Sequence, residues 1–198
     1  MGLLSELGSM SQGISQCWWL SKHCVVDWEA WAAWGTIAAV FVALFGPSVQ
    51  RWLVKRKTNA MFSIAYQNDL LEAVVRLEGL KNTYPLNPDA DDGWAVHESI
   101  TKGETRELFL TICSGLDAFC GREVGLSKWP AIDIEIAVAV ARAIQRVRDF
   151  QKGAELLANS HEARDWHDFM GSVNKAFNRA MDAIKKAERV TSRACKGF

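Results

Sequence analysis

Three residues in the C-terminal part of this 198-residue chain have the chemistry of metal ligands. His161, Asp165 and Asp168 are three or four residues apart, so on a helix they would share one face. Imidazole and carboxylate groups placed together can bind a transition metal. The sequence offers no second cluster to complete such a site, and we expect these side chains to form a polar exterior opposite Trp166.

A second group of polar residues resembles a calcium-binding loop. Asn87, Asp89, Asp91 and Glu98 fall at the first, third, fifth and twelfth positions of the calcium-loop template. The template requires glycine at its sixth position for a sharp turn, but this chain has Asp92 there. Asn87 also replaces the aspartate of the first position. We therefore predict an exposed acidic loop without a bound metal.

Motifs that identify common enzyme classes are absent from the sequence. There is no Walker loop, dinucleotide-binding glycine motif, HExxH, GxSxG or paired CxxC motif. No histidine follows an arginine at the distance found in helical HEPN ribonucleases. Basic and acidic residues are balanced, with 23 of each, so charge does not favour nucleic acid as a partner. We expect a protein that is not an enzyme, with no catalytic residues, no metal and no other cofactor.

The cysteines divide into two groups along the chain. Cys17 and Cys24 lie close together near the N-terminus, whereas Cys113, Cys120 and Cys195 lie in the C-terminal part. In an oxidising compartment the first pair could form a disulfide that stabilises a small loop by about 2 kcal/mol. Two unpaired thiols are the alternative. Cys113 and Cys120 are seven residues apart, so on a helix they would share a face as small core residues.

Residues 30–50 form an apolar stretch without a charged side chain. At a helical rise of about 1.5 Å per residue, the stretch spans roughly 30 Å, the thickness of a bilayer hydrocarbon core. Tryptophans, which are typical of membrane interfaces, flank it at Trp28, Trp31, Trp34 and Trp52. We predict a transmembrane helix over residues 30–50, with the lipid bilayer as a partner.

Basic residues predict the orientation of this span. The basic cluster within residues 51–57 follows it directly, whereas Lys22 is the one lysine or arginine that precedes it. Basic residues concentrate on the cytoplasmic side of a membrane. We therefore expect residues 51–198 to form a cytoplasmic helical domain and residues 1–29 a short extracytoplasmic tail. No signal-peptide pattern is present, which favours an uncleaved, single-pass anchor in the cell inner membrane.

Small residues recur every four positions within the span. Gly35, Ala39 and Ala43 would line one helical face, where two backbones can approach closely in lipid. We predict that this stripe supports transmembrane association, the alternative being the ordinary abundance of small residues in spanning helices. Pro47, near the inner end, is expected to kink or loosen the helix.

Apolar spacing predicts two helical segments directly after the span. A helix over about residues 59–81, which can continue the spanning helix, would bury Ile64, Leu71, Val74 and Leu77. A capping box formed by Thr101 and Glu104 predicts the start of the next helix, which would end near Gly121. Its apolar stripe would consist of Leu108, Ile112, Gly115 and Phe119.

Two longer helices follow, each with a regular spacing of four and three residues between apolar positions. We expect Pro130 to start the first and Asn159, in a capping box, to start the second. The first stripe consists of Ile136, Val140, Ala143, Val147, Phe150, Ala154 and Leu157. The second consists of Trp166, Met170, Val173, Phe177, Ala180, Ile184 and Ala187. Residues 132–140 also alternate like a strand, but the long continuation favours helix. The stripes predict a long antiparallel helix hairpin with these residues as its core.

The sequence as a whole predicts an all-α protein: a single-pass transmembrane helix followed by a cytoplasmic helical bundle. This order of parts resembles that of small single-pass proteins of bacterial antiviral loci, whose helical cytoplasmic domains assemble into rings at the membrane. Our main hypothesis is a non-catalytic interaction or scaffold module that forms a homo-oligomer and binds a cytoplasmic protein partner. The alternative is a membrane-perturbing or pore-forming effector. Thr36 is the one polar group near mid-bilayer and gives a pore no aqueous lining, which favours the first hypothesis.

Overall fold

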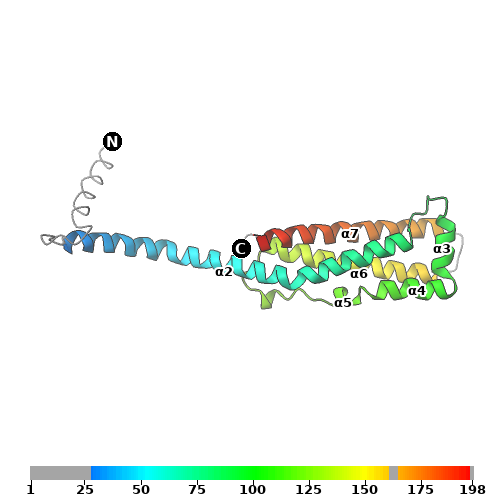
Figure 1. The fold of residues 1–198 in the computed structure, drawn as a ribbon, viewed down its shortest axis with the longest axis horizontal. Helices are drawn as coiled ribbons and strands as arrows, with labels where there is room; N and C mark the ends of the chain where they lie inside the picture. The colour runs from blue at the N-terminus through cyan, green and yellow to red at the C-terminus, as the bar shows by residue number, and fades with distance from the viewer. Residues whose placement is uncertain (1–27, 161–164, 197–198) are drawn as a thin grey trace, which may run out of the picture. The chain divides into compact units, whose positions relative to one another are not determined.

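The computed structural model describes residues 28–160 and 165–196 (Figure 1). Within these ranges the regular elements are all helices and no strand is present, which confirms the all-α prediction there. The elements are α2 (Trp28–Thr83), α3 (Gly93–Thr101), α4 (Gly103–Ser114), α5 (Asp117–Cys120), the short 3-10 helix η1 (Leu126–Lys128), α6 (Ile134–Asn159) and α7 (Trp166–Lys196).

The chain divides into two compact units, Met1–Leu53 and Val54–Phe198. The long helix α2 contributes to both units and runs from Trp28 to Thr83 without interruption, with Pro47 inside it. This confirms that the helix expected over residues 59–81 continues the apolar segment. The predicted disulfide partners Cys17 and Cys24 lie outside the described residues, as does most of the predicted tail.

The buried face of α2 in the second unit agrees with the predicted one only in part, because Leu77 is buried as expected but two other members of the set are not. Ile64 and Leu71 are exposed, and the side chains that pack into the domain are Phe62, Tyr66, Leu70, Ala73, Leu77 and Leu80. Both faces of the helix carry apolar residues at helical spacing, so periodicity did not distinguish them. The aromatic residues decide the face, because Phe62 meets Trp129 edge to face with ring centroids 5.5 Å apart.

The start of α4 also corrects the sequence prediction. α4 begins at Gly103, and Lys102 rather than Thr101 is its N-cap residue, without a side-chain capping bond. The Thr101 hydroxyl donates instead to the carbonyl of His97 in α3, at 2.9 Å. Gly103 has a φ of 62°, a conformation that glycine adopts without steric strain. The chain therefore turns sharply between α3 and α4, and no capping box forms.

The buried face of α4 lies beside the predicted stripe, because Leu108 is exposed whereas Phe109 and Cys113 are buried. Phe119, the last member of that stripe, is buried in α5 as predicted, together with Leu116 just before this helix. The predicted single helix is also divided, because α4 ends at Ser114 and α5 begins at Asp117.

The first of the two long helices, α6, begins later than predicted. Asp133 is its N-cap, and the Asp133 carboxylate accepts a hydrogen bond from the backbone N–H of Glu135 at 3.3 Å. Pro130 therefore lies before the helix instead of starting it. Asn159 is the last residue of α6 and does not cap α7, which begins at Trp166. Residues 134–140 are helical, as expected despite their alternating pattern.

α6 and α7 make the most extensive contact between helices of the second unit (Figure 1). Phe150 and Phe177 meet there, and Gly153 lies opposite Val173. The large residues of the two predicted stripes that are buried in α6 and α7 are Ile136, Val140, Val147, Phe150, Leu157, Met170, Val173, Phe177 and Ile184. Trp166, at the start of α7, is only half-buried.

Candidate functional site

The apolar part of α2 in the first unit is the main candidate for a functional surface. From Trp31 to Leu53, every residue except the half-buried Gly46 is exposed, including the large apolar ones. Among the described residues, this is the one helix long and apolar enough to cross a membrane. Exposed apolar surface on this scale is unfavourable in water and is expected of a segment that contacts lipid.

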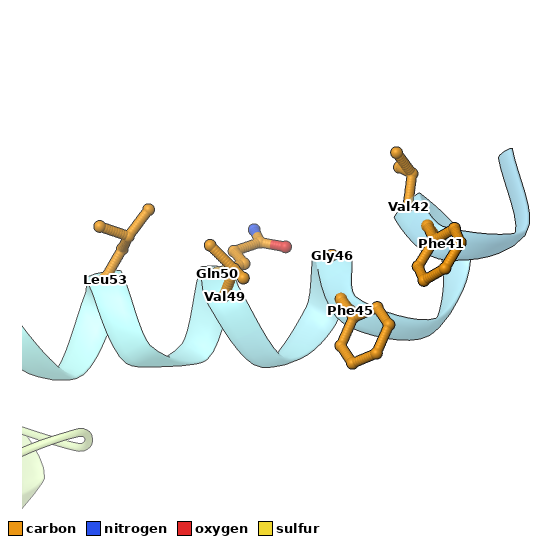
Figure 2. A pocket seen from close by; sticks show the side chains of 7 residues that line it. All are labelled: Phe41, Val42, Phe45, Gly46, Val49, Gln50 and Leu53. Carbon is orange, nitrogen blue, oxygen red and sulfur yellow. The ribbon is translucent and has the colours of Figure 1, made fainter. Parts of the chain in front are cut away.

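A shallow groove lies along this segment near its C-terminal end (Figure 2). Its volume is about 460 Å³, and its lining residues are Phe41, Val42, Phe45, Gly46, Val49, Gln50 and Leu53. Gly46 forms the gap, because it has no side chain and the neighbouring side chains on its face point outward on either side (Figure 2). Phe41 and Phe45 stack with their ring centroids 5.9 Å apart along one edge. Sequence reasoning missed Gly46, although it lies three residues after Ala43.

The predicted association stripe lies on the same segment. Gly35, Ala39 and Ala43 are all exposed. A Cβ atom added to Gly35 would have no neighbour within 4 Å, so the backbone there is open to close approach. Thr36, the polar residue nearest the middle of the predicted span, donates its hydroxyl to the Ala32 carbonyl at 2.8 Å. That hydroxyl is satisfied within its own helix and does not need water.

Lys55 and Asn59, early in the second unit, both contact Asp133. Lys55 Nζ lies 2.8 Å from the Asp133 carboxylate. The Asn59 amide oxygen accepts from the backbone N–H of Asp133, also at 2.8 Å. The hydrogen bond from Lys55 is the main cause that lowers the pKa of Asp133, because it stabilises the charged carboxylate. These contacts join α2 to the start of α6.

An aromatic cluster surrounds His97 in α3. The ring centroid of His97 lies 5.4 Å from that of Trp94 and 5.5 Å from that of Trp166. His97 is buried, and neither of its ring nitrogens has a hydrogen-bond partner among the described residues. Burial lowers the pKa of His97, because an apolar surrounding disfavours the charged imidazolium. Trp166 is half-buried, and its ring packs on those of Trp94 and His97.

The residues considered as metal ligands do not converge. Asn87 Oδ1 accepts a hydrogen bond from the backbone N–H of Asp89, whose carboxylate lies 3.0 Å from His167 Nε2. Glu98 forms an ion pair with Lys102 at 2.7 Å. Asp165 and Asp168 are exposed, and His161 lies outside the described residues. Among the residues that were placed, no group of three or more His, Cys, Asp or Glu could hold a metal ion.

A polar groove of about 650 Å³ separates α4 and α5 from α6. Its lining residues are Arg106, Leu110, Cys113, Ser114, Asp117, Arg148, Gln151, Lys152, Glu155 and Asn159. Three of the polar side chains, those of Arg106, Arg148 and Gln151, donate to backbone carbonyls at the ends of neighbouring helices. These bonds tie the short helices to α6.

Two cysteines of the second unit have the properties of core residues. Cys113 and Cys120 are free and buried. Burial raises the pKa of Cys113 to about 12 and that of Cys120 to about 11. Because the thiolate is the reactive form of cysteine, both thiols are poor nucleophiles. Cys195 is also free and is half-buried.

No protein-family model, curated protein or solved structure matches this chain.

Proposed function

We propose that this protein is a single-pass inner-membrane protein whose helical domain is a non-catalytic, self-associating interaction module. The observation that carries the proposal is the course of α2. This single helix contains both the exposed apolar segment that ends near Leu53 and the side chains, from Phe62 to Leu80, that pack into the second unit. An element that is apolar on all sides in one part and packed into a domain in the other is suited to anchor that domain to a membrane.

The cytoplasmic orientation rests on charge. The basic cluster within residues 51–57 immediately follows the apolar segment, and basic residues are retained on the cytoplasmic side. Lys55, one member of this cluster, also pairs with Asp133 in the second unit. The inner side of the membrane is therefore the side on which we expect the second unit to lie.

The proposed domain is a helical bundle built around a long antiparallel hairpin of α6 and α7. Phe150 contacts Phe177, and Gly153 contacts Val173. The residue number increases along α6 while that of the partner on α7 decreases, which supports an antiparallel direction. Such a bundle gives a rigid platform with long, regular helix faces. Helix faces of this kind are a common means of binding a second protein or a second copy of the same chain.

The buried or paired state of the reactive groups supports a non-catalytic role. The thiols of Cys113 and Cys120 are held in the protonated form by burial. His97 lies between tryptophan rings, and the carboxylates of Asp133 and Glu98 are paired with lysines. In an enzyme, an acid, a base or a nucleophile would be expected to converge on the position of a reacting atom. The groups named here instead pack in the core or pair with neighbouring side chains, which favours a non-catalytic role.

Thiol labelling in cells with a permeabilised outer membrane tests this topology. After reduction, we expect a membrane-impermeant maleimide to label Cys17 or Cys24 and to leave Cys195 unlabelled until the inner membrane is opened. Cys113 and Cys120 are uninformative because their burial protects them on either side of the membrane. A Cys195→Ser variant identifies the signal of Cys195. Labelling of Cys195 in cells with an intact inner membrane would overturn the orientation, and release of the protein by alkaline carbonate would overturn the span.

A further inference from the structure

We propose that the exposed face of α2 formed by Met61, Ile64, Asn68, Leu71 and Val75 binds the same face of a second copy as a parallel coiled coil. We call this surface the α2 seam. The inference rests on the proposed function, since it identifies the surface through which the membrane-anchored chain self-associates.

The α2 seam is an apolar surface that its own domain leaves uncovered. Met61 is 52% exposed, Ile64 64%, Leu71 42% and Val75 68%. On the opposite face of the same helix, Leu70 and Leu77 are fully buried. α2 therefore carries two apolar faces in the second unit, and one of them is already occupied by the domain core. Burial of the other face, the α2 seam, against a partner would remove its apolar side chains from water, which is favourable.

The spacing of the seam residues is that of a coiled coil. They follow one another at intervals of three, four, three and four residues, so they occupy alternating a and d positions of a heptad. An interval that averages 3.5 residues keeps the stripe facing one partner helix along its length. The stripe from Met61 to Val75 is about 21 Å long at a rise of about 1.5 Å per residue. A seam with this period fits another long helix better than an irregular protein surface.

The polar residue of the seam favours a second copy of this chain as the occupant. Asn68 is exposed and lies at the central a position, between the apolar layers of Ile64 and Leu71. In a parallel pair in register, Asn68 of one chain meets Asn68 of the other, and the two amides can hydrogen-bond to each other. A single asparagine at an a position specifies register and oligomeric state in this way. Val75 at a and Leu71 at d are the combination that favours two strands.

Charge and membrane anchoring agree with a parallel pair. No charged side chain lies among the five seam residues, so like charges do not meet across the seam. Glu72, beside the seam, is paired with Arg76 of its own helix at 2.6 Å. Two copies anchored in one membrane in the same orientation would present their α2 helices in parallel. The seam follows the basic cluster of residues 51–57, which marks the membrane surface, so lipid tails are not its partner.

The test measures the oligomeric state of the full chain in detergent by light scattering. The double variant Ile64→Glu with Leu71→Glu should be monomeric at concentrations at which the parent is a dimer, because it places carboxylates opposite each other across the seam. Leu156→Glu is the matched control, since Leu156 is a 61% exposed leucine on α6, away from the seam. It should remain dimeric. Circular dichroism melting of all variants verifies that the fold is retained.

Disulfide crosslinking in native membranes gives a second measurement. In a chain with serine at Cys17, Cys24 and Cys195, Asn68→Cys should form a crosslinked dimer on mild oxidation. Arg76→Cys, exposed on the same helix but outside the seam, should not. The parent can be oligomeric while the double glutamate variant behaves like Leu156→Glu and Asn68→Cys crosslinks no better than Arg76→Cys. In that case the α2 seam is not the interface, but the proposed self-association stands. If the parent is monomeric in both detergent and membranes, the seam and the proposed self-association both fail.

Discussion

Phe150 of α6 and Phe177 of α7 meet edge to face, with ring centroids 5.3 Å apart and ring planes at 78°. Both side chains are buried, at 0% and 2% exposure. Edge-to-face packing adds about 0.5–1.5 kcal/mol to the gain from burying two aromatic side chains. This pair lies in the contact between α6 and α7, so removal of either ring would leave a gap between the two helices.

Phe177→Ala is therefore expected to destabilise the protein strongly. Removal of a buried phenylalanine leaves a cavity and costs about 3–5 kcal/mol of unfolding free energy. The melting temperature of the full chain in detergent, followed by circular dichroism, measures this loss. Leu156→Ala is the control, because Leu156 is exposed on α6 and its truncation should change the melting temperature little. An unchanged melting temperature in Phe177→Ala would show that the two helices do not depend on this contact.

The buried His97 predicts a dependence of stability on pH. The pKa of His97 in the folded protein lies below its ordinary value of 6.5, chiefly because of burial. The unfolded chain then binds more protons than the folded one below about pH 6.5. The contribution of neutral His97 is present above that pH and is lost as the pH falls through the folded-state pKa. We expect the melting temperature to decrease between pH 7.5 and pH 5.

Replacement of His97 by Phe separates this effect from other titrations. The ring of phenylalanine can keep the contacts with Trp94 and Trp166 and has no nitrogen that needs a partner. The variant should be at least as stable as the parent at pH 7.5, and its melting temperature should fall less toward pH 5. His167→Gln, on the exposed histidine that lies 3.0 Å from Asp89, is the control for removal of a histidine elsewhere in the domain. Equal slopes in the parent and in His97→Phe would exclude His97 as the titrating group.

Asp133 has two roles at the start of α6 that substitutions can separate. Its carboxylate caps the helix and pairs with Lys55. Asp133→Ala should lose both interactions, and the lost cap alone costs about 0.5–2 kcal/mol. Asp133→Asn keeps a capping oxygen and should lose less. Because the pKa of Asp133 lies below its ordinary value of 3.8, the stabilisation is present above that pH and is lost as the pH falls through the folded-state pKa. A lower melting temperature at neutral pH for Asp133→Asn than for Asp133→Ala would contradict the capping role.

The small-residue stripe of the apolar segment gives a prediction that is separate from the α2 seam. Ala39→Ile keeps the segment apolar, but its added bulk should hold two neighbouring backbones apart. We expect a lower yield of crosslinked oligomer than in the parent, with membrane insertion unchanged. Phe41→Ile replaces an exposed side chain outside the stripe and should leave the yield unchanged. Equal yields in the two variants would show that the stripe does not direct association.

The sequence by itself determined the features that depend on local composition and period. An uncharged apolar run long enough to cross a bilayer can be read without any knowledge of neighbours, and it proved to be a continuous helix. The all-helical class followed in the same way for the described residues. The regular four-and-three spacing from Ile136 and from Met170 identified positions that are buried, because residues that recur at this spacing share one face of a helix.

Only the tertiary structure decided which of two apolar faces of α2 is covered. Phe62, Leu70 and Leu77 are buried while Ile64 and Leu71 are exposed, although both sets have helical spacing. Helix ends were settled by contacts distant in sequence as well. Asp133, not Pro130, starts α6, and its backbone N–H is held by Asn59, 74 residues earlier. Trp166 packs on the rings of Trp94 and His97 in α3, which its place in the apolar spacing of α7 did not predict. A helical period specifies that a face is apolar, but the partner that covers the face is fixed by side chains elsewhere in the chain, which no local pattern encodes.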